Sequence, residues 1–196
     1  MNGKTIYLAS RSPRRAELLQ QIGLNFKVLP SDVDETPLLN ELSHEYVVRL
    51  AGEKARACFA QLQIEKMALY PVLAADTTVS VDGRILGKPQ DDEDAFQMLS
   101  MMSGRWHEVH TGIAIATEDG VKTALSTTRV EMATLTDEKI LAYVATGEPR
   151  DKAGAYGIQG LASAMIKRIE GSYSGVMGLP IYETTMLLEQ VDIHVL

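Results

Sequence analysis

Cysteine is almost absent from this chain of 196 residues, and aromatic residues are few. The single cysteine, Cys58, excludes an internal disulfide and a zinc site built from paired cysteines. It lies in an apolar helical pattern, which predicts a small core residue and not a nucleophile. Cysteine usage of this kind is typical of a cytoplasmic protein, and we expect that compartment.

Long apolar runs are also missing. No stretch approaches the ~20 apolar residues of a membrane-spanning helix, and the N-terminal segment does not resemble a signal peptide. The formal net charge of −7 argues against a broad surface for nucleic acid or an anionic membrane. We therefore expect neither nucleic acid nor membrane as a partner. A local basic pocket for a small anion is still compatible with a net negative charge.

The rest of the composition is that of an ordinary globular protein, with 45% hydrophobic and 23% charged residues. The length predicts one domain over residues 1–196. Apolar periodicity predicts strands over 5–9, 26–29, 72–75, 105–117, 121–135 and 164–169, with a hairpin over 78–86. It predicts helices over 16–22, 44–62, 91–102, 137–146 and 179–191, with Ser43 as the N-cap of the second and a loop over 170–178.

The segment Ser10-Arg11-Ser12-Pro13-Arg14-Arg15 connects the first strand to the first helix. Ser12 suits the N-cap position, and Pro13 suits the first helical position because its missing N–H would be unpaired there. Free N–H groups of the first turn beside two guanidinium groups favour a bound phosphate. An ordinary capped helix with two solvated arginines fits the same residues, so spacing alone leaves both interpretations open.

Acidic and basic residues at other points suit chemistry as well as structure. The loop Ser31–Pro37 carries three carboxylates, which fit a solvated turn or, less favourably, oxygen ligands for Mg²⁺. Asp76 follows a buried apolar run, and we expect it to end that strand, where it would act in catalysis or cap a turn. Lys88 lies between a glycine and a proline that restrict its backbone. Lys54 is by default a surface lysine.

Two further features are weighed in the same way. His107 and His110 are three residues apart on a predicted strand, which places them on opposite faces, argues against a shared metal and favours structural roles for both. The glycine-rich segment 148–160 indicates a loop where backbone approaches a ligand, or a flexible crossover. An anion site, an acidic loop, an acid after a strand and two lysines are the set that phosphoryl chemistry requires.

In their order these motifs resemble the Maf family, nucleoside triphosphate pyrophosphatases related in fold to the inosine triphosphate pyrophosphatases. They span nearly the whole chain: Ser10-x-Ser12-Pro13-Arg14-Arg15, Val33-Asp34-Glu35, Glu53-Lys54-Ala55, Ala75-Asp76-Thr77, Gly87-Lys88-Pro89, Asp151–Gly160 and Gly178-Leu179-Pro180. The resemblance implies an α/β fold with a mixed sheet, flanking helices and two lobes around a central cleft.

The resemblance also implies cleavage of a nucleoside triphosphate between the α and β phosphates, assisted by a divalent cation, Mg²⁺ or Mn²⁺. Carried onto this chain, Asp76 matches the proton acceptor, and Glu35, Lys54 and Lys88 match the other catalytic positions. We interpret Glu35 and Asp76 as metal ligands and the lysines as a balance for phosphate charge. If Asp76 binds the cation, it orients the water and is not a free base. The residues interpreted as phosphate-binding are Ser10, Ser12 and Arg15.

Arg14, Thr77 and Gln159 resemble the branch of the family that is selective for thymidine and uridine triphosphates. The 7-methylguanosine branch has Trp, Gln and Glu there. Gln159 offers a donor and an acceptor, which suits the mixed edge of uracil or thymine. The resemblance thus implies dTTP and UTP as substrates, and a homodimer. Two alternatives stay open: modified pyrimidine nucleotides as the substrates, and a nucleotide-binding regulator of cell division and septum formation with little turnover.

Overall fold

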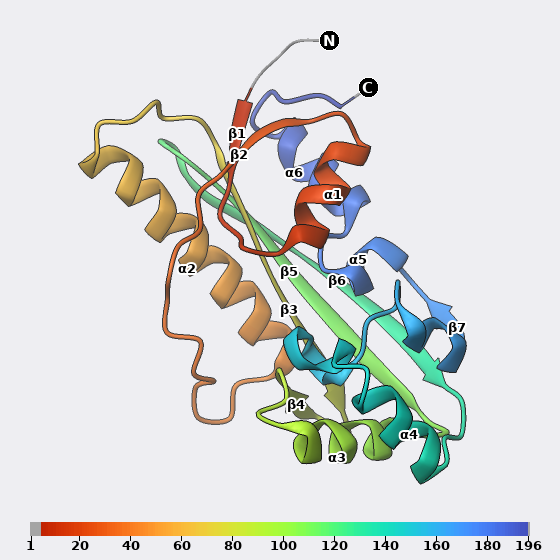
Figure 1. Cartoon of the computed structure of the whole chain (residues 1–196). Helices are drawn as coiled ribbons and strands as arrows, with labels where there is room; N and C mark the ends of the chain where they lie inside the picture. Colours follow the sequence, from red (N-terminus) through yellow and green to blue (C-terminus); the bar gives the residue numbers. More distant parts are fainter. Residues whose placement is uncertain (1–4, 196) are drawn as a thin grey trace.

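The computed structural model describes residues 5–195, whose helices surround a single sheet (Figure 1). The strands are β1 (Thr5–Leu8), β2 (Asn25–Val28), β3 (Val72–Val81), β4 (Arg84–Leu86), β5 (Trp106–Thr117), β6 (Gly120–Met132) and β7 (Ile166–Glu170). The α-helices are α1 (Pro13–Gln21), α2 (Ser43–Ile64), α3 (Asp92–Met102), α4 (Asp137–Val144), α5 (Tyr173–Met177) and α6 (Ile181–Glu189). Short 3₁₀ helices cover Glu148–Asp151, Ala153–Ala155 and Leu161–Met165.

The sheet is mixed. Its order is β2-β1-β3-β5-β6-β7, and β4 pairs with β3 outside this path. β1 lies parallel to β2 and β3, whereas β3, β5, β6 and β7 pair in antiparallel fashion. The expected α/β fold with a mixed sheet and flanking helices is therefore confirmed. Among residues 5–195, no helix is long and apolar enough to cross a membrane.

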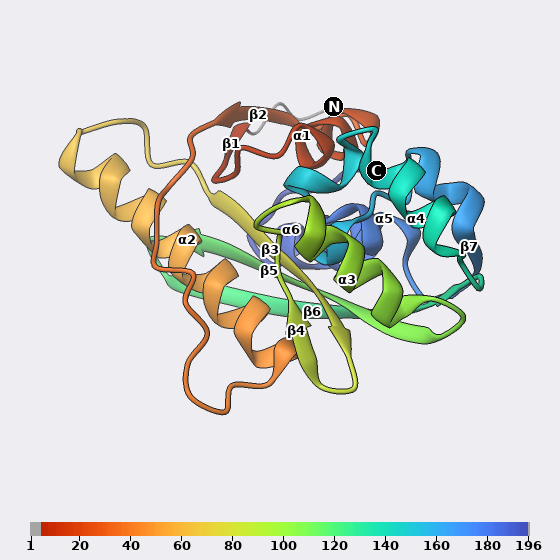
Figure 2. The same cartoon turned by 60° about the horizontal axis from the view of Figure 1, so that its bottom comes forward.

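The two faces of the sheet are covered differently (Figures 1 and 2). On β3, Val72 and Ala74 pack with α2, whereas Leu73 and Ala75 pack with α1 and α6 on the opposite face. Further along that second face, Val79 packs with α3 and α4. Because side chains alternate along a strand, these contacts place α2 on one face and two groups of helices on the other.

Strand β3 is longer than the sequence predicts, and this changes the position of Asp76. β5 pairs with β3 continuously from Val72 to Ser80, so Asp76 lies in mid-strand and the prediction that it ends the strand was wrong. On the other edge of β3, β1 pairs only at Val72 and Leu73, and β4 begins only at Val79. Among the described residues no strand pairs with β3 on this edge between Leu73 and Val79, so the middle of the strand is unpaired there although its side chains are largely buried.

Other local predictions have mixed outcomes. The hairpin around Asp82-Gly83 is confirmed, as is the placement of His107 and His110 on opposite faces, where they contact Tyr156 and Thr127. The predicted loop over 170–178 contains α5, and the last strand begins later than expected, after a 3₁₀ turn. These short helices are held by tertiary contacts and carry no helical apolar period.

The two cap predictions have different outcomes. The one for α2 was wrong, because Ser43 is the first residue of that helix and Glu45 accepts from the N–H of Leu42. The one for α1 is confirmed in position, since Ser12 is the N-cap residue and Pro13 the first helical residue. The Ser12 side chain makes no capping bond within the described residues, and the backbone N–H of Ser12 donates to Ser10 Oγ at 3.1 Å.

Gly112 of β5 sets how closely α2 approaches the sheet. A Cβ at this position would lie 2.3 Å from the backbone oxygen of Val47. We expect Gly112→Ala to displace α2 and to lower the free energy of unfolding by about 2–3 kcal/mol. The measurement is urea unfolding followed by circular dichroism. The matched control is Gly52→Ala in α2, where a Cβ would meet only the Arg56 side chain at 3.4 Å. Equal midpoints for the two variants would contradict the packing argument.

Candidate active site

A cavity of about 880 Å³ opens at the free edge of β3. Its walls come from the loop after β1, the loop before α2, α2 itself, β3, the turn after β4, the segment 148–160 and the end of α5. It therefore lies where α2, the start of α1 and the segment 148–160 come together. All ten residues that the sequence analysis selected line it: Ser10, Ser12, Arg14, Arg15, Glu35, Lys54, Asp76, Thr77, Lys88 and Gln159. Their placement together is a property of the fold, and their roles are taken up as a proposal below.

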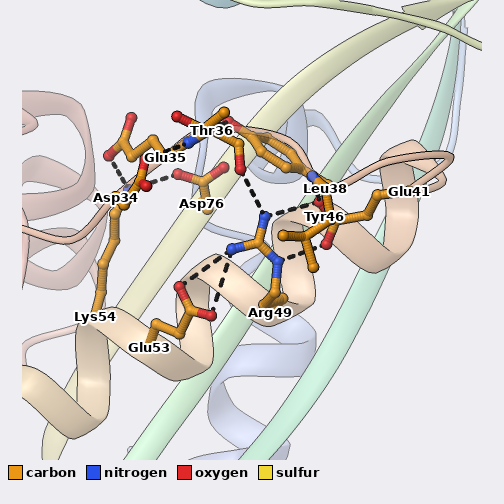
Figure 3. A network of polar contacts seen from close by, with 10 residues as sticks. All are labelled: Asp34, Glu35, Thr36, Leu38, Glu41, Tyr46, Arg49, Glu53, Lys54 and Asp76. Atoms are coloured by element: carbon orange, nitrogen blue, oxygen red, sulfur yellow. Dashed lines mark hydrogen bonds and ion pairs between the residues drawn. The ribbon is translucent and has the colours of Figure 1, made fainter.

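The α2 side of the cavity is built around Lys54 (Figure 3). Its Nζ lies 2.7 Å from Asp76 Oδ1 and 2.6 Å from Glu35 Oε1. Lys54 is only 9% exposed, so its default interpretation as a surface lysine was wrong. The helix buries the aliphatic stem against the sheet and leaves the ammonium between two carboxylates that come from β3 and the preceding loop.

Asp76 has an unusual environment for a carboxyl group. Its residue exposure is 8%, and this burial raises the pKa of the Asp76 carboxyl above its ordinary value. The charges of Lys54 and Arg15 oppose that rise, and the Lys54 hydrogen bond adds to them. A carboxylate whose pKa is raised binds a proton more readily than a solvated one, which suits it to accept a proton from water.

Arg15 occupies the opposite side of the cavity. Its Nε donates to the Gly178 carbonyl at 2.7 Å, its Nη1 to Ser10 Oγ at 3.2 Å and its Nη2 to Thr77 Oγ1 at 3.1 Å. These acceptors are uncharged, and burial lowers the pKa of the guanidinium, which nevertheless stays protonated. A positive charge held by neutral oxygens at a cavity wall favours an anionic ligand.

The two sides meet because the edge of β3 is open. Asp76 and Thr77 are neighbours on the strand, so their side chains point to opposite faces of the sheet. Asp76 contacts Lys54 of α2, and Thr77 contacts Arg15 of α1 and Thr111 of β5. Both residues nevertheless line the same cavity, since no neighbouring strand covers this edge within the described residues.

The rim carries more charge. Arg14 Nη1 lies 3.4 Å from Asp151 Oδ2, and Lys152 Nζ lies 2.5 Å from Asp151 Oδ1. Lys88 and Gln159 are exposed at the cavity. An anionic ligand would compete with the exposed Asp151 for these cations, at little cost because surface ion pairs contribute weakly.

Sequence reasoning missed several lining residues. Tyr46 lies two helical turns before Lys54 in α2, and this spacing was the available signal. Glu148 accepts from Tyr143 OH at 2.9 Å and from the N–H of Leu161 at 2.9 Å, which fixes both ends of the segment that carries Gln159. Glu148 belongs to the glycine-rich segment that was expected to approach a ligand.

The carboxylates of Glu35 and Asp76 fit a hard divalent cation. Among residues 5–195, no group of three or more His, Cys, Asp or Glu side chains forms a ligand set. Mg²⁺ commonly binds through one or two carboxylates together with the phosphates of a substrate. Two carboxylates beside an anion-binding wall therefore suit a cation that arrives with a phosphate ligand better than a permanently bound one.

Comparison with known proteins agrees with the motif order. Residues 5–191 match the family model described as Maf-like protein. The chain belongs to the Maf family. It is 62% identical over 195 residues to a dTTP/UTP pyrophosphatase of Methylobacillus flagellatus, with 100% of this chain and 96% of the relative covered. It is 50% identical to a dTTP/UTP pyrophosphatase of Nitrosomonas europaea, over 98% of this chain and 97% of that relative.

One solved structure is a more distant match to this Maf family chain. It is described as the structure of the Staphylococcus aureus Ham1 protein, and it is 20% identical with a TM-score of 0.44. The match covers 66% of this chain and 72% of that one. A match this distant carries no functional inference, and the fold class rests on the sheet and helices described above.

Lys54 compensates the burial of Asp76, and this can be tested by stability. We expect Lys54→Met to lower the free energy of unfolding by about 3 kcal/mol, because a buried carboxylate then loses its counter-ion. The double variant Lys54→Met/Asp76→Asn should be more stable than Lys54→Met. Guanidinium unfolding at pH 7 measures both, with the exposed Lys139→Met as the control, expected within about 0.5 kcal/mol of wild type. Equal losses in the single and double variants would contradict the compensation.

Proposed function

We propose that this Maf family member is a nucleoside triphosphate pyrophosphatase that hydrolyses dTTP and UTP to the monophosphate and pyrophosphate. The observation that carries the proposal is the cavity at the open edge of β3, where a carboxylate pair and an anion-binding wall face each other. The names of the relatives at 62% and 50% identity support the same substrates. Modified pyrimidine nucleotides with the same base edge fall within this proposal.

The phosphate chain would bind on the α1 side. Arg15 supplies a fixed positive charge, and Ser10 and Ser12 supply hydroxyl groups beside the start of α1. Lys88 approaches from the turn after β4 and balances further phosphate charge. This arrangement leaves the α phosphate facing the carboxylates on the α2 side.

Hydrolysis would take place beside Lys54. Glu35 and Asp76 would hold the divalent cation, which supplies positive charge to the phosphate oxygens and acidity to a bound water. Asp76 would then orient the attacking water, and the proton of that water passes to solvent, because a carboxylate that holds a cation is not a free base. The water oxygen bonds to the α phosphorus while the bond to the bridging oxygen breaks, and pyrophosphate leaves. Lys54 keeps the two carboxylates together and offsets the negative charge that accumulates.

The base would be read by Arg14 and Gln159 at the rim and by Thr77, which lies beside Arg15 on the cavity wall. Gln159 is exposed on a segment whose ends Glu148 fixes, so its amide is presented by a held backbone. An amide matches the donor and acceptor edge that uracil and thymine share. The thymine methyl group adds only about 1 kcal/mol of burial, which explains why one site would accept both bases.

A panel of nucleoside triphosphates tests the proposal. With Mg²⁺ or Mn²⁺, dTTP and UTP should be cleaved with release of pyrophosphate and not of single phosphate. Excess EDTA should abolish the reaction, and Asp76→Asn should remove most turnover while nucleotide binding stays measurable by calorimetry. Release of single phosphate, or turnover that EDTA leaves intact, would contradict the proposed reaction. Full activity in Asp76→Asn would remove Asp76 from it.

Gln159→Glu tests how the base is recognised. The new carboxylate should repel the carbonyl oxygens of uracil and thymine, and kcat/KM for UTP and dTTP should fall about 10- to 100-fold. The loss for ATP and GTP should be smaller. Gln63→Glu, at an exposed position of α2 away from the cavity, is the matched control for the added charge. An equal loss for all nucleotides would indicate a folding defect and not a change in base selection.

A further inference from the structure

Glu35 lies on a segment that secondary structure does not hold. Residues 29–42 connect β2 to α2 and form neither helix nor strand. The Glu35 side chain is 54% exposed, yet its carboxylate reaches Lys54 Nζ at 2.6 Å. An exposed carboxylate on a long loop is mobile unless its backbone is fixed elsewhere. The contacts that fix this backbone therefore decide where the carboxylate lies.

Two side chains of α2 bind the loop backbone at and next to Glu35 (Figure 3). The hydroxyl of Tyr46 donates to the Glu35 carbonyl at 2.9 Å. Arg49 Nη2 donates to the Thr36 carbonyl at 3.3 Å. Tyr46 and Arg49 are three residues apart, so they share one side of the helix, and the guanidinium lies 5.6 Å from the centre of the Tyr46 ring. Successive carbonyls of the loop are thus tied to one helical turn.

Arg49 is itself held on two sides. Its Nε and Nη2 donate to the two carboxylate oxygens of Glu41 at 2.5 and 2.7 Å, and its Nη1 donates to Glu53 at 3.2 Å. Glu41 also accepts from the N–H of Leu38 at 2.9 Å. The Glu41 side chain is only 7% exposed, and the hydrogen bond from Arg49 lowers the pKa of that carboxyl. A bidentate, largely buried pair of this kind fixes the direction of the guanidinium.

The same helix consequently holds Glu35 at two points. Tyr46 and Arg49 bind the backbone at residues 35 and 36, and Lys54, five residues after Arg49, binds the carboxylate. General stabilisation of the loop would not require the contacts to converge there. Their position at the residue that carries the carboxylate favours a role in placing it.

We propose that Tyr46, Arg49 and Glu41 are positioning residues that set the Glu35 carboxylate opposite Asp76 in the cavity. The contacts of Tyr46, Arg49 and Glu41 that hold the loop backbone are called the brace below. This inference rests on the proposed function, because it gives the brace the task of placing the carboxylate that would receive the cation. Without the brace, Glu35 keeps its pair with Lys54 but loses its fixed backbone. The carboxylate then meets the cation in the correct place for a smaller fraction of the time.

Conservative variants test this role. Tyr46→Phe removes the hydroxyl and keeps the ring. Arg49→Lys keeps the positive charge and removes the guanidinium group that makes several hydrogen bonds at once. Arg129→Lys is the matched control for the arginine, because Arg129 also pairs with a glutamate at 3.1 Å and lies over an aromatic ring at 4.6 Å, but away from the cavity. Tyr182→Phe, at a 72% exposed position of α6, is the control for the hydroxyl.

The kinetic measurement compares the Mg²⁺ concentration that the reaction requires with KM for UTP. Tyr46→Phe and Arg49→Lys should raise the Mg²⁺ concentration for half-maximal pyrophosphate release about tenfold and lower kcat by a similar factor. KM for UTP at saturating Mg²⁺ should stay within about twofold of wild type, because the substitutions leave Arg15 and the serines proposed to bind the phosphates unchanged. Both controls should match wild type. An unchanged Mg²⁺ requirement in both variants would overturn the proposal.

A second readout does not depend on turnover. Hydrogen exchange measured by mass spectrometry, without metal or nucleotide, should be faster over residues 31–42 in Tyr46→Phe and Arg49→Lys than in wild type and controls. Unchanged exchange over these residues would contradict the proposal that Tyr46 and Arg49 fix the loop backbone, even if activity falls. Conversely, a wild-type protein that releases no pyrophosphate, together with faster loop exchange in the variants, would refute the proposed function while leaving the backbone contacts established.

Discussion

The site depends on one ammonium group placed between two carboxylates. Asp76 is buried and Glu35 faces it, and two such groups repel each other unless a cation lies between them. Lys54 is that cation, and it reaches both because α2 packs directly on β5, where Gly112 leaves no side chain in the way. The position of a whole helix is therefore tied to the charge balance of one carboxyl pair, and the loop before the helix is tied to it through Glu35.

The open edge of β3 explains how one cavity receives groups of opposite charge. Along this strand Asp76 faces α2 and Thr77 faces α1, so the carboxylates collect on one side of the sheet and the Arg15 guanidinium on the other. A phosphate chain lying across the edge would contact the arginine with one part of its length. Another part would face the carboxylates, with a cation between them. A strand paired on both edges would separate these two sides.

Sequence reasoning identified most elements, because apolar periodicity decides them, and the ordered motifs indicated the family. It failed where tertiary contact overrides local pattern. The apolar run stops before Asp76, but pairing with β5 continues through it, and no local signal reports that pairing. Lys54 looks like a surface lysine since its partner Asp76 is 22 residues away in sequence. No sequence motif at Tyr46 or Arg49 predicts that these side chains contact the backbone at Glu35 and Thr36. Such contacts appear only when the loop is placed against the helix.

The acidic loop shows why composition alone is a poor guide to a metal site. Its carboxylates have different partners: Asp32 pairs with Arg11, Asp34 accepts from the N–H of Thr36, and only Glu35 turns to Lys54. The run is thus neither a plain solvated turn nor a single ligand cluster. If Glu35 and Asp76 hold the cation as proposed, they fill only part of its coordination sphere and leave the rest to water and phosphate oxygens. Cation and nucleotide binding would then be coupled, and the precision with which the brace holds Glu35 would matter most when both are present.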